Sequence, residues 1–238
     1  MRHLAIIVYF LALASSLVSA QRSKEPPEDD DPQITINTVS TSGSGCPSGA
    51  VSVSISLDRT VVTLGFDQFH VGVGHSFSSS DREKECNIHL NLHYPAGYSY
   101  AVIETTYHGF AQLSEGVEGT FESEYVFADE NGQGLLGGLL GGLLGGLVGV
   151  VGDLLGVVTH VVLPGGGLFA DGESFSITEE VPASKRVLAP CDGKDVNLLI
   201  RTTVSISATN RNAEGQIIDD DATIDLTQQV HLEWQKCR

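Results

Sequence analysis

The sequence feature that most constrains the fold is a repeated alternation of apolar and polar side chains. Val51, Val53 and Ile55 alternate with serines. Neighbouring side chains of a β-strand point to opposite faces, so strict alternation predicts strands with one buried face and one face in water. Four later runs show the same pattern, with these apolar members: Ile88, Leu90, Leu92 and Tyr94; Phe121, Tyr125 and Phe127; Val196, Leu198, Ile200, Val204, Ile206 and Ala208; Ile224, Leu226, Val230, Leu232 and Trp234.

Further strands are expected at 60–71, 98–107 and 173–180. Turn-forming residues such as Asp58-Arg59 and Asn210-Arg211-Asn212 separate the apolar runs. No segment has the spacing of an amphipathic helix. About eight or nine antiparallel strands without helices are typical of the all-β class, and we predict an antiparallel, jelly-roll-like β-sandwich.

The N-terminal residues predict a secreted protein. Arg2 precedes an apolar run, and Val18-Ser19-Ala20 has the small residues of a cleavage site, so residues 1–20 are expected to be a secretory signal peptide. Residues 21–33 are acidic and contain prolines, which predicts a disordered lead-in. Residues 34–238 are then expected to form a single domain.

Four cysteines follow the predicted signal peptide: Cys46, Cys86, Cys191 and Cys237. An even count in a secreted chain predicts disulfides, and no C-x-x-C spacing suggests zinc or redox chemistry. Three connectivities are open, and we favour Cys46–Cys86 with Cys191–Cys237. Each bridge would close a loop of about 40 to 47 residues, worth roughly 4 kcal/mol in the chain-entropy account.

A Leu/Gly-rich segment is expected to interrupt the domain at 131–168. Residues 134–152 carry no polar side chain, and glycine recurs at every fourth position in two series. We consider three interpretations: a low-complexity loop, a segment that touches membranes or self-associates, and a membrane-spanning helix. The second would act through residues 134–163, and its central members are Leu139, Leu140, Gly141, Leu143, Leu144 and Gly145. A spanning helix is disfavoured because both flanks belong to one sandwich.

Several cysteine contexts occur in a characteristic order. They are Gly45-Cys46-Pro47-Ser48-Gly49, the run from Cys86 to Pro95, Pro190-Cys191 and Trp234-Gln235-Lys236-Cys237, with Tyr107-His108-Gly109-Phe110-Ala111-Gln112-Leu113 between the second and third. Over about 45–237 the chain resembles the mostly fungal family of domain of unknown function number 4360, with an unusual Leu/Gly insert. The resemblance implies secretion and an all-β domain, and it supplies no catalytic residues.

The charge excludes nucleic acid as a partner. The chain has 13 basic and 30 acidic residues, a net charge of −17, which would repel a phosphate backbone. The segment Gly74-His75-Ser76-Phe77-Ser78 is the nearest approach to a nucleophile elbow, but it lacks the final glycine. His89 and His93 share a strand face but lie roughly 13 Å apart, too far to bind one zinc ion.

A calcium loop is the one metal site that the spacing suggests. Asn210, Asn212 and Glu214, with Asp221 eleven residues after Asn210, resemble the ligand spacing of such a loop. The alternative is a solvated hairpin loop without metal. No other cofactor is expected.

We therefore expect a non-enzymatic binding protein that acts at the cell surface or in the extracellular space. Its partner would be an extracellular protein or glycan, bound through sandwich loops or a sheet face. Secretion in a fungal family suggests the cell wall or a host apoplast as the location, and a host-directed effector or hydrolase inhibitor as the role. The alternatives are a secreted glycan-active hydrolase and a membrane-active protein that works through 134–163.

Overall fold

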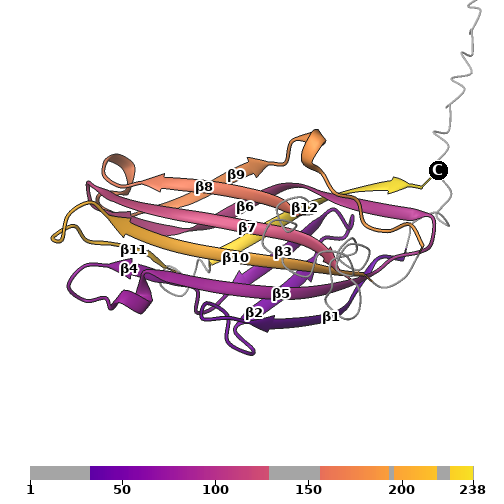
Figure 1. Cartoon of the computed structure of the whole chain (residues 1–238), viewed down its shortest axis with the longest axis horizontal. Coiled ribbons are helices and arrows are strands. Elements are labelled where there is room, and N and C mark those ends of the chain that lie inside the picture. Colours follow the sequence, from indigo (N-terminus) through magenta and orange to yellow (C-terminus); the bar gives the residue numbers. More distant parts are fainter. Residues whose placement is uncertain (1–32, 129–155, 193–195, 219–225, 238) are drawn as a thin grey trace, which may run out of the picture. The chain divides into compact units, whose positions relative to one another are not determined.

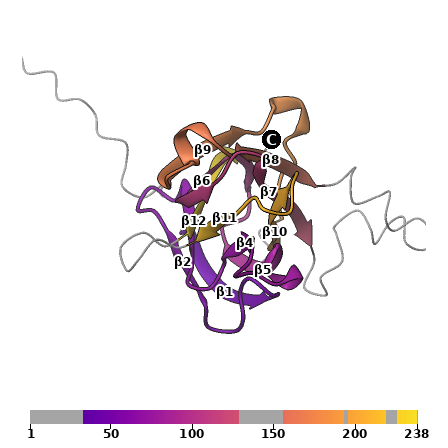
Figure 2. The ribbon, with the colours of Figure 1, turned by 90° about the vertical axis from the view of Figure 1, so that its left-hand side faces the viewer.

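In the computed structural model, two antiparallel sheets pack face to face (Figures 1 and 2). The structure describes residues 33–128, 156–192, 196–218 and 226–237, all within the unit Pro32–Arg238. The predicted all-β antiparallel sandwich is confirmed. The predicted signal peptide at 1–20 and the lead-in up to residue 32 lie outside the described residues.

The first sheet has five strands, and β10 lies at its centre. Their order across the sheet is β1 (Thr35–Ser42), β5 (Glu83–His93), β10 (Val196–Ala208), β7 (Val117–Ala128) and β8 (Val157–Pro164). In the register, Ile200 of β10 lies opposite Ile88 of β5 and Tyr125 of β7. Strands that are distant in sequence are therefore neighbours in this sheet.

The second sheet has seven strands. Their order is β2 (Val51–Ile55), β3 (Val61–Phe66), β12 (Leu226–Lys236), β6 (Tyr98–Leu113), β11 (Gly215–Ile218) and β4 (Val71–Val73), and β9 (Glu173–Glu180) pairs with β6. The long strand β6 pairs with β12 over Tyr98–His108 and with β11 over Phe110–Leu113. It therefore organises most of this sheet.

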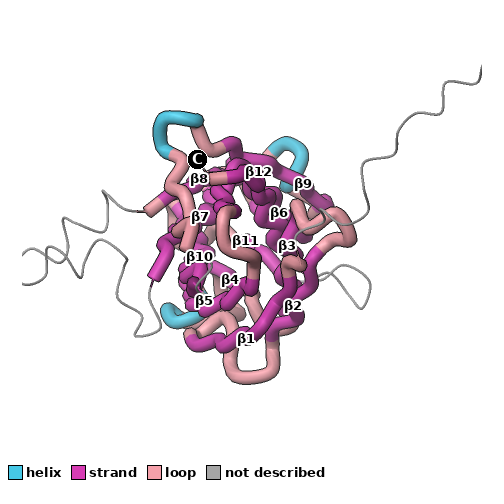
Figure 3. Tube along the Cα trace, turned by 90° about the vertical axis from the view of Figure 1, so that its right-hand side faces the viewer, coloured by secondary structure: helices cyan, strands magenta, loops and turns pink. Residues whose placement is uncertain are grey.

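The helical content of the described residues is limited to three single turns (Figure 3). These 3₁₀ turns are η1 (Ser79–Asp81), η2 (Gly167–Phe169) and η3 (Ala183–Lys185). All three lie in connections between strands, so the packed layers are made of strands alone.

The core lies between the two sheets and is formed by the inward-facing apolar residues that the alternation predicts. Ile88, Leu90 and Leu92 of β5 are fully buried, as are Leu198 and Val204 of β10. An aromatic cluster adds to this core: Tyr100 packs against Tyr94, Phe127 and Trp234 with ring centroids 4.7–5.5 Å apart.

A buried polar network crosses the core and joins the sheets. Gln228 of β12 donates to Ser123 Oγ (3.1 Å) and Tyr125 OH (2.8 Å) of β7, and it accepts from Thr202 Oγ1 of β10 (2.8 Å). Its members are Thr105, Tyr107, Ser123, Tyr125, Thr159, Thr202 and Gln228. Each is at most 2% exposed, so these hydrogen bonds form away from water.

Two predicted strand boundaries change in the structure. The strand expected at 60–71 is two strands, because β3 ends at Phe66 and the exposed Asp67 and Gln68 turn the chain before β4. The strand expected at 98–107 continues to Leu113, because β11 and β9 provide partners beyond Tyr107.

Strand β8 lies within the segment that we predicted as the insert 131–168. Val157, Thr159, Val161 and Leu163 are buried in alternation with exposed residues, and β8 pairs with β7 along its whole length. Valines occupy both faces of β8, so the alternation is hidden in the sequence. Residues 129–155 lie outside the described residues, including Leu139, Leu140, Gly141, Leu143, Leu144 and Gly145.

Two disulfides tie the connections to the sheets. They are Cys46–Cys86 and Cys191–Cys237, the connectivity favoured from the sequence. The first joins the β1–β2 connection to β5, and the second joins the segment before β10 to the residue after β12. The described residues include no free cysteine.

Candidate functional site

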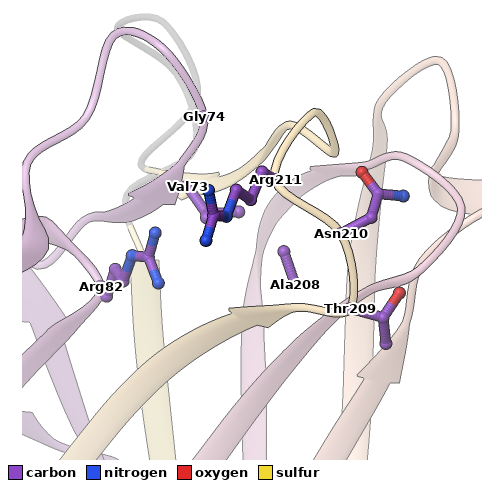
Figure 4. A pocket seen from close by; sticks show the side chains of 7 residues that line it. All are labelled: Val73, Gly74, Arg82, Ala208, Thr209, Asn210 and Arg211. Carbon is purple, nitrogen blue, oxygen red and sulfur yellow. The ribbon is translucent and has the colours of Figure 1, made fainter.

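A pocket of about 210 Å³ lies where β4 of one sheet and β10 of the other both end (Figure 4). Three segments form it: the end of β4, the residue between η1 and β5, and the β10–β11 turn. The lining residues are Val73, Gly74, Arg82, Ala208, Thr209, Asn210 and Arg211. The pocket therefore combines residues from both layers of the sandwich.

Two arginines dominate the charge of this pocket. Arg82 and Arg211 extend their guanidinium groups toward the same region on one side of Ala208 (Figure 4). The other three described arginines have partners: Arg59 donates to a backbone carbonyl, Arg186 pairs with Glu233 and Arg201 pairs with Glu124. Neither pocket guanidinium has a hydrogen-bond or ion-pair partner among the described residues.

The backbone holds both arginines in place. Ile206 of β10 donates its N–H to the carbonyl of Arg82 (2.8 Å), which fixes the start of β5 against β10. The turn that carries Arg211 is tied to the β6–β7 turn, where Thr209 donates its N–H to the Gly116 carbonyl (2.8 Å) and Glu214 donates to Ser114 Oγ (3.0 Å). The two cationic side chains therefore project from anchored segments.

Two acidic residues in the adjoining segments already have partners. Asp81 accepts hydrogen bonds from the Ser78 hydroxyl and N–H and pairs with Lys84 (3.4 Å). Glu214 accepts a hydrogen bond from His75 Nδ1 (3.0 Å). These hydrogen bonds, from Ser78 to Asp81 and from His75 to Glu214, lower the pKa of each carboxyl group. Both carboxylates are thus held by groups other than the pocket arginines.

Gly74 brings the rim of the pocket close to Glu214. Its φ of +130° lies in the region that favours glycine, and a Cβ at this position would lie 2.9 Å from Glu214 Cγ. A larger residue would both strain the backbone and displace the Glu214 side chain. The shape of this rim depends on glycine.

This arrangement is suited to binding an anion. A guanidinium presents several N–H donors in a planar fork that matches carboxylate, sulfate or phosphate oxygens. Two such forks beside each other repel unless an anion lies between them. The pocket supplies charge recognition, and it brings together no pair of carboxylates and no nucleophile with a base.

The structure places the calcium candidates around this pocket without gathering them as ligands. Asn210 lines the pocket beside the arginines, and its Oδ1 accepts a hydrogen bond from the Asn212 N–H (2.9 Å). Glu214 binds His75, and Asp221 lies outside the described residues. Among the described residues no group of three or more His, Cys, Asp or Glu side chains is placed to hold a metal ion. A calcium site at these residues stays a prediction.

The other residues considered from the sequence lie apart from one another. His89 and His93 are both exposed on β5 in the first sheet. The segment 74–78 is the connection between β4 and η1, and its Phe77 ring packs over Gly72. It contributes Gly74 to the pocket rim.

Sequence reasoning missed the two arginines. Arg211 was considered only as a turn residue, and Arg82 follows the polar run Ser78-Ser79-Ser80-Asp81 without a motif of its own. The scarcity of basic residues in this acidic chain is the one relevant signal, and it does not indicate which of the 13 basic residues lie together.

Comparison with protein families settles the relationship of the chain. The model of the domain of unknown function DUF4360 matches residues 32–237. The chain belongs to the DUF4360 family. The resemblance expected from the cysteine contexts is therefore confirmed, and the match begins at residue 32 rather than 45. A relative of this DUF4360 chain is an uncharacterised secreted protein of Arthroderma benhamiae, 29% identical over 223 residues, which covers 91% of this chain and 80% of the relative.

Similar solved structures include two carbohydrate-binding modules. One is TmCBM61 in complex with β-1,4-galactotriose, 10% identical, with a TM-score of 0.22, covering 84% of this DUF4360 chain and 90% of the module. The other is the family 11 module of Clostridium thermocellum with a mixed-linked tetrasaccharide, 10% identical, with a TM-score of 0.24, covering 83% and 91%. TM-scores this low carry no inference about function.

The helical turns in the described part of the chain are too short to cross a bilayer.

Proposed function

We propose that this protein is a secreted, non-enzymatic binding protein that holds an anionic group of an extracellular partner between Arg82 and Arg211. The observation that carries the proposal is the pair of guanidinium groups that line one pocket without a partner among the described residues. The naming of its Arthroderma relative as secreted supports an extracellular place of action.

The charge of the chain makes this pocket distinctive. With 13 basic against 30 acidic residues, most of the surface is expected to repel anions. Both pocket arginines are exposed to solvent, so each contact with a ligand is weakened by water and salt. We therefore expect specific but modest affinity for a single anionic group, with further affinity coming from contacts outside the pocket.

The partner is an extracellular protein or glycan in this proposal. Action in the cell wall or a host apoplast, as a host-directed effector or an inhibitor of a hydrolase, would be a more specific form of the same binding role. A secreted glycan-active hydrolase stays a prediction, as does membrane activity through 134–163, a segment whose residues 157–163 belong to β8.

The first experiment is a titration of the ¹⁵N-labelled mature protein with inorganic sulfate, followed by NMR. We expect the Nε–H signals of Arg82 and Arg211 to shift together, and we expect R82Q or R211Q to weaken sulfate binding by about tenfold. R201Q is the matched control, because Arg201 already pairs with Glu124 on the outer face of the first sheet. It should bind sulfate like the wild type.

Two results would contradict the proposal. If R82Q, R211Q and the wild type bind sulfate with equal affinity, the pocket is not the anion-binding site. Shortening of glycans during incubation with the protein, measured by mass spectrometry, would contradict the non-enzymatic role.

A further inference from the structure

We infer that the pocket binds one acidic sugar residue of a glycan, with its anionic substituent at Arg82 and Arg211 and its ring hydroxyls at Thr209 and Asn210. This inference rests on the proposed function and names the class of ligand for the same site. The three features that carry it are the size of the pocket, the arrangement of its lining, and the absence of a large apolar side chain from that lining.

The size fits one sugar ring. Pockets for drug-sized ligands span about 300–1,000 Å³, whereas this one measures about 210 Å³. A single ring with its substituents would occupy it, and the rest of a longer chain would lie along the surface outside.

The lining divides into a charged side and a polar side. The two arginines lie on one side of Ala208, and Thr209 and Asn210 lie on the other (Figure 4). Val73 and Ala208 contribute small apolar surface. A sugar acid has the matching parts: an anionic substituent, hydroxyl groups, and a ring face made of C–H groups.

The polar side retains capacity for hydrogen bonds with hydroxyl groups. The Thr209 hydroxyl donates to the Gly116 carbonyl (3.1 Å), so its oxygen can still accept a hydrogen bond. The Asn210 Oδ1 accepts from the Asn212 N–H, so its amide NH₂ can still donate. A hydroxyl group both donates and accepts, and it can therefore use both residues.

An acidic peptide fits this lining less well. Protein partners usually bind through large anchors, such as aromatic side chains, that fill apolar pockets. Val73 and Ala208 are the only apolar side chains in the lining, and both are small. They offer a peptide side chain little apolar surface to bury, whereas they suit the small C–H face of a sugar ring.

The test compares four probes of similar length by isothermal titration calorimetry. They are a uronic acid trisaccharide, a sulfated trisaccharide, the corresponding neutral trisaccharide and the peptide Glu-Glu-Glu. We expect at least one acidic trisaccharide to bind tenfold or more tightly than the neutral trisaccharide and the peptide. The difference between the uronate and the sulfated probe identifies the anionic substituent.

Variants separate recognition of the charge from recognition of the sugar. R82Q and R211Q should each weaken binding of the acidic trisaccharide about tenfold, whereas R201Q should leave it unchanged. N210S keeps an oxygen that can accept from the Asn212 N–H, but it replaces the amide NH₂ by a hydroxyl on a shorter side chain. It should therefore weaken trisaccharide binding threefold or more and leave inorganic sulfate binding unchanged. An unchanged melting temperature for each variant shows that the fold is intact.

The outcomes distinguish this inference from the proposed function. If Glu-Glu-Glu binds as tightly as the acidic trisaccharides and needs both arginines, specificity for an acidic sugar is refuted and the anion-binding role stands. Specificity for an acidic sugar is also refuted if N210S weakens sulfate and trisaccharide binding equally. If no anionic probe depends on Arg82 or Arg211, the proposed function itself fails.

Discussion

Gln228 offers the sharpest test of what joins the two sheets. Its side chain makes three buried hydrogen bonds, with Ser123, Tyr125 and Thr202 of the opposite sheet, and it is 1% exposed. Replacement by alanine removes these bonds and leaves a cavity. Without Gln228, the Thr202 hydroxyl loses its acceptor, whereas Ser123 keeps bonds to Tyr107 and Thr202, and Tyr125 keeps its bond to Thr105.

The magnitude follows from these partners. The Thr202 hydroxyl, left without its acceptor, costs about 1–3 kcal/mol, and the cavity left by the side chain costs roughly 2 kcal/mol more. We therefore expect Q228A to lower the free energy of unfolding by about 3–5 kcal/mol. For a domain of this size each kcal/mol corresponds to about 2–4 °C, so the melting temperature should fall by roughly 6–20 °C.

The assay is thermal unfolding of the mature protein with intact disulfides, followed by near-ultraviolet circular dichroism. Q229A is the control, because Gln229 is the next residue of β12 and faces outward, and its melting temperature should change by no more than about 2 °C. Q228L restores most of the volume but none of the hydrogen bonds. If Q228L melts at the wild-type temperature, the network contributes no net stability and the reasoning is wrong.

Three further predictions concern the disulfides and two types of titrating group. Replacing both Cys46 and Cys86 by serine should cost about 4 kcal/mol of unfolding free energy, because the bridge closes a loop with a sequence separation of 40; a loss below 1 kcal/mol in urea unfolding would contradict this. Burial raises the pKa of Tyr100, Tyr107 and Tyr125, so the folded state favours their neutral form. The stabilisation of the folded state by these neutral tyrosines should be complete below a pH of about 10 and be lost as the pH rises further. Absorbance at about 295 nm should show the three tyrosines ionising only with unfolding. S78A removes the hydroxyl that lowers the pKa of Asp81, so carboxyl ¹³C NMR should show this pKa rising; an unchanged titration would exclude the hydrogen bond.

Much of the fold could be predicted because burial on one face leaves a direct mark in the sequence. The alternation of Val196 to Ala208 gave β10 with its inward residues, and the bounds of the strand at 173–180 match β9. The alternation failed at β8, where exposed Val158 and Val162 are 48% and 40% accessible and make both faces apolar. Five of the eight residues of β8 are β-branched, which favours a strand even where both faces are apolar, and β7 provides its pairing partner.

The candidate site could not be predicted, because it depends on the register of distant strands. Arg82 and Arg211 are more than 100 residues apart, and only the pairing of β5 with β10 places their segments together. Asn210 was singled out as a calcium ligand, since its spacing to Asn212 and Glu214 is local and visible. The cationic neighbours that change the chemistry around it come from the tertiary structure.

The position of β12 determines when the second sheet can be completed during synthesis. This strand lies between β3 and β6, yet residues 226–236 are made more than 100 residues after either neighbour. Until they are available, the edges of β3 and of Tyr98–His108 in β6 that face β12 have no partner for backbone hydrogen bonds, and such unpaired edges favour aggregation. We therefore expect this sheet to form only after synthesis has passed β12, and the Cys191–Cys237 bond to form in the same late stage.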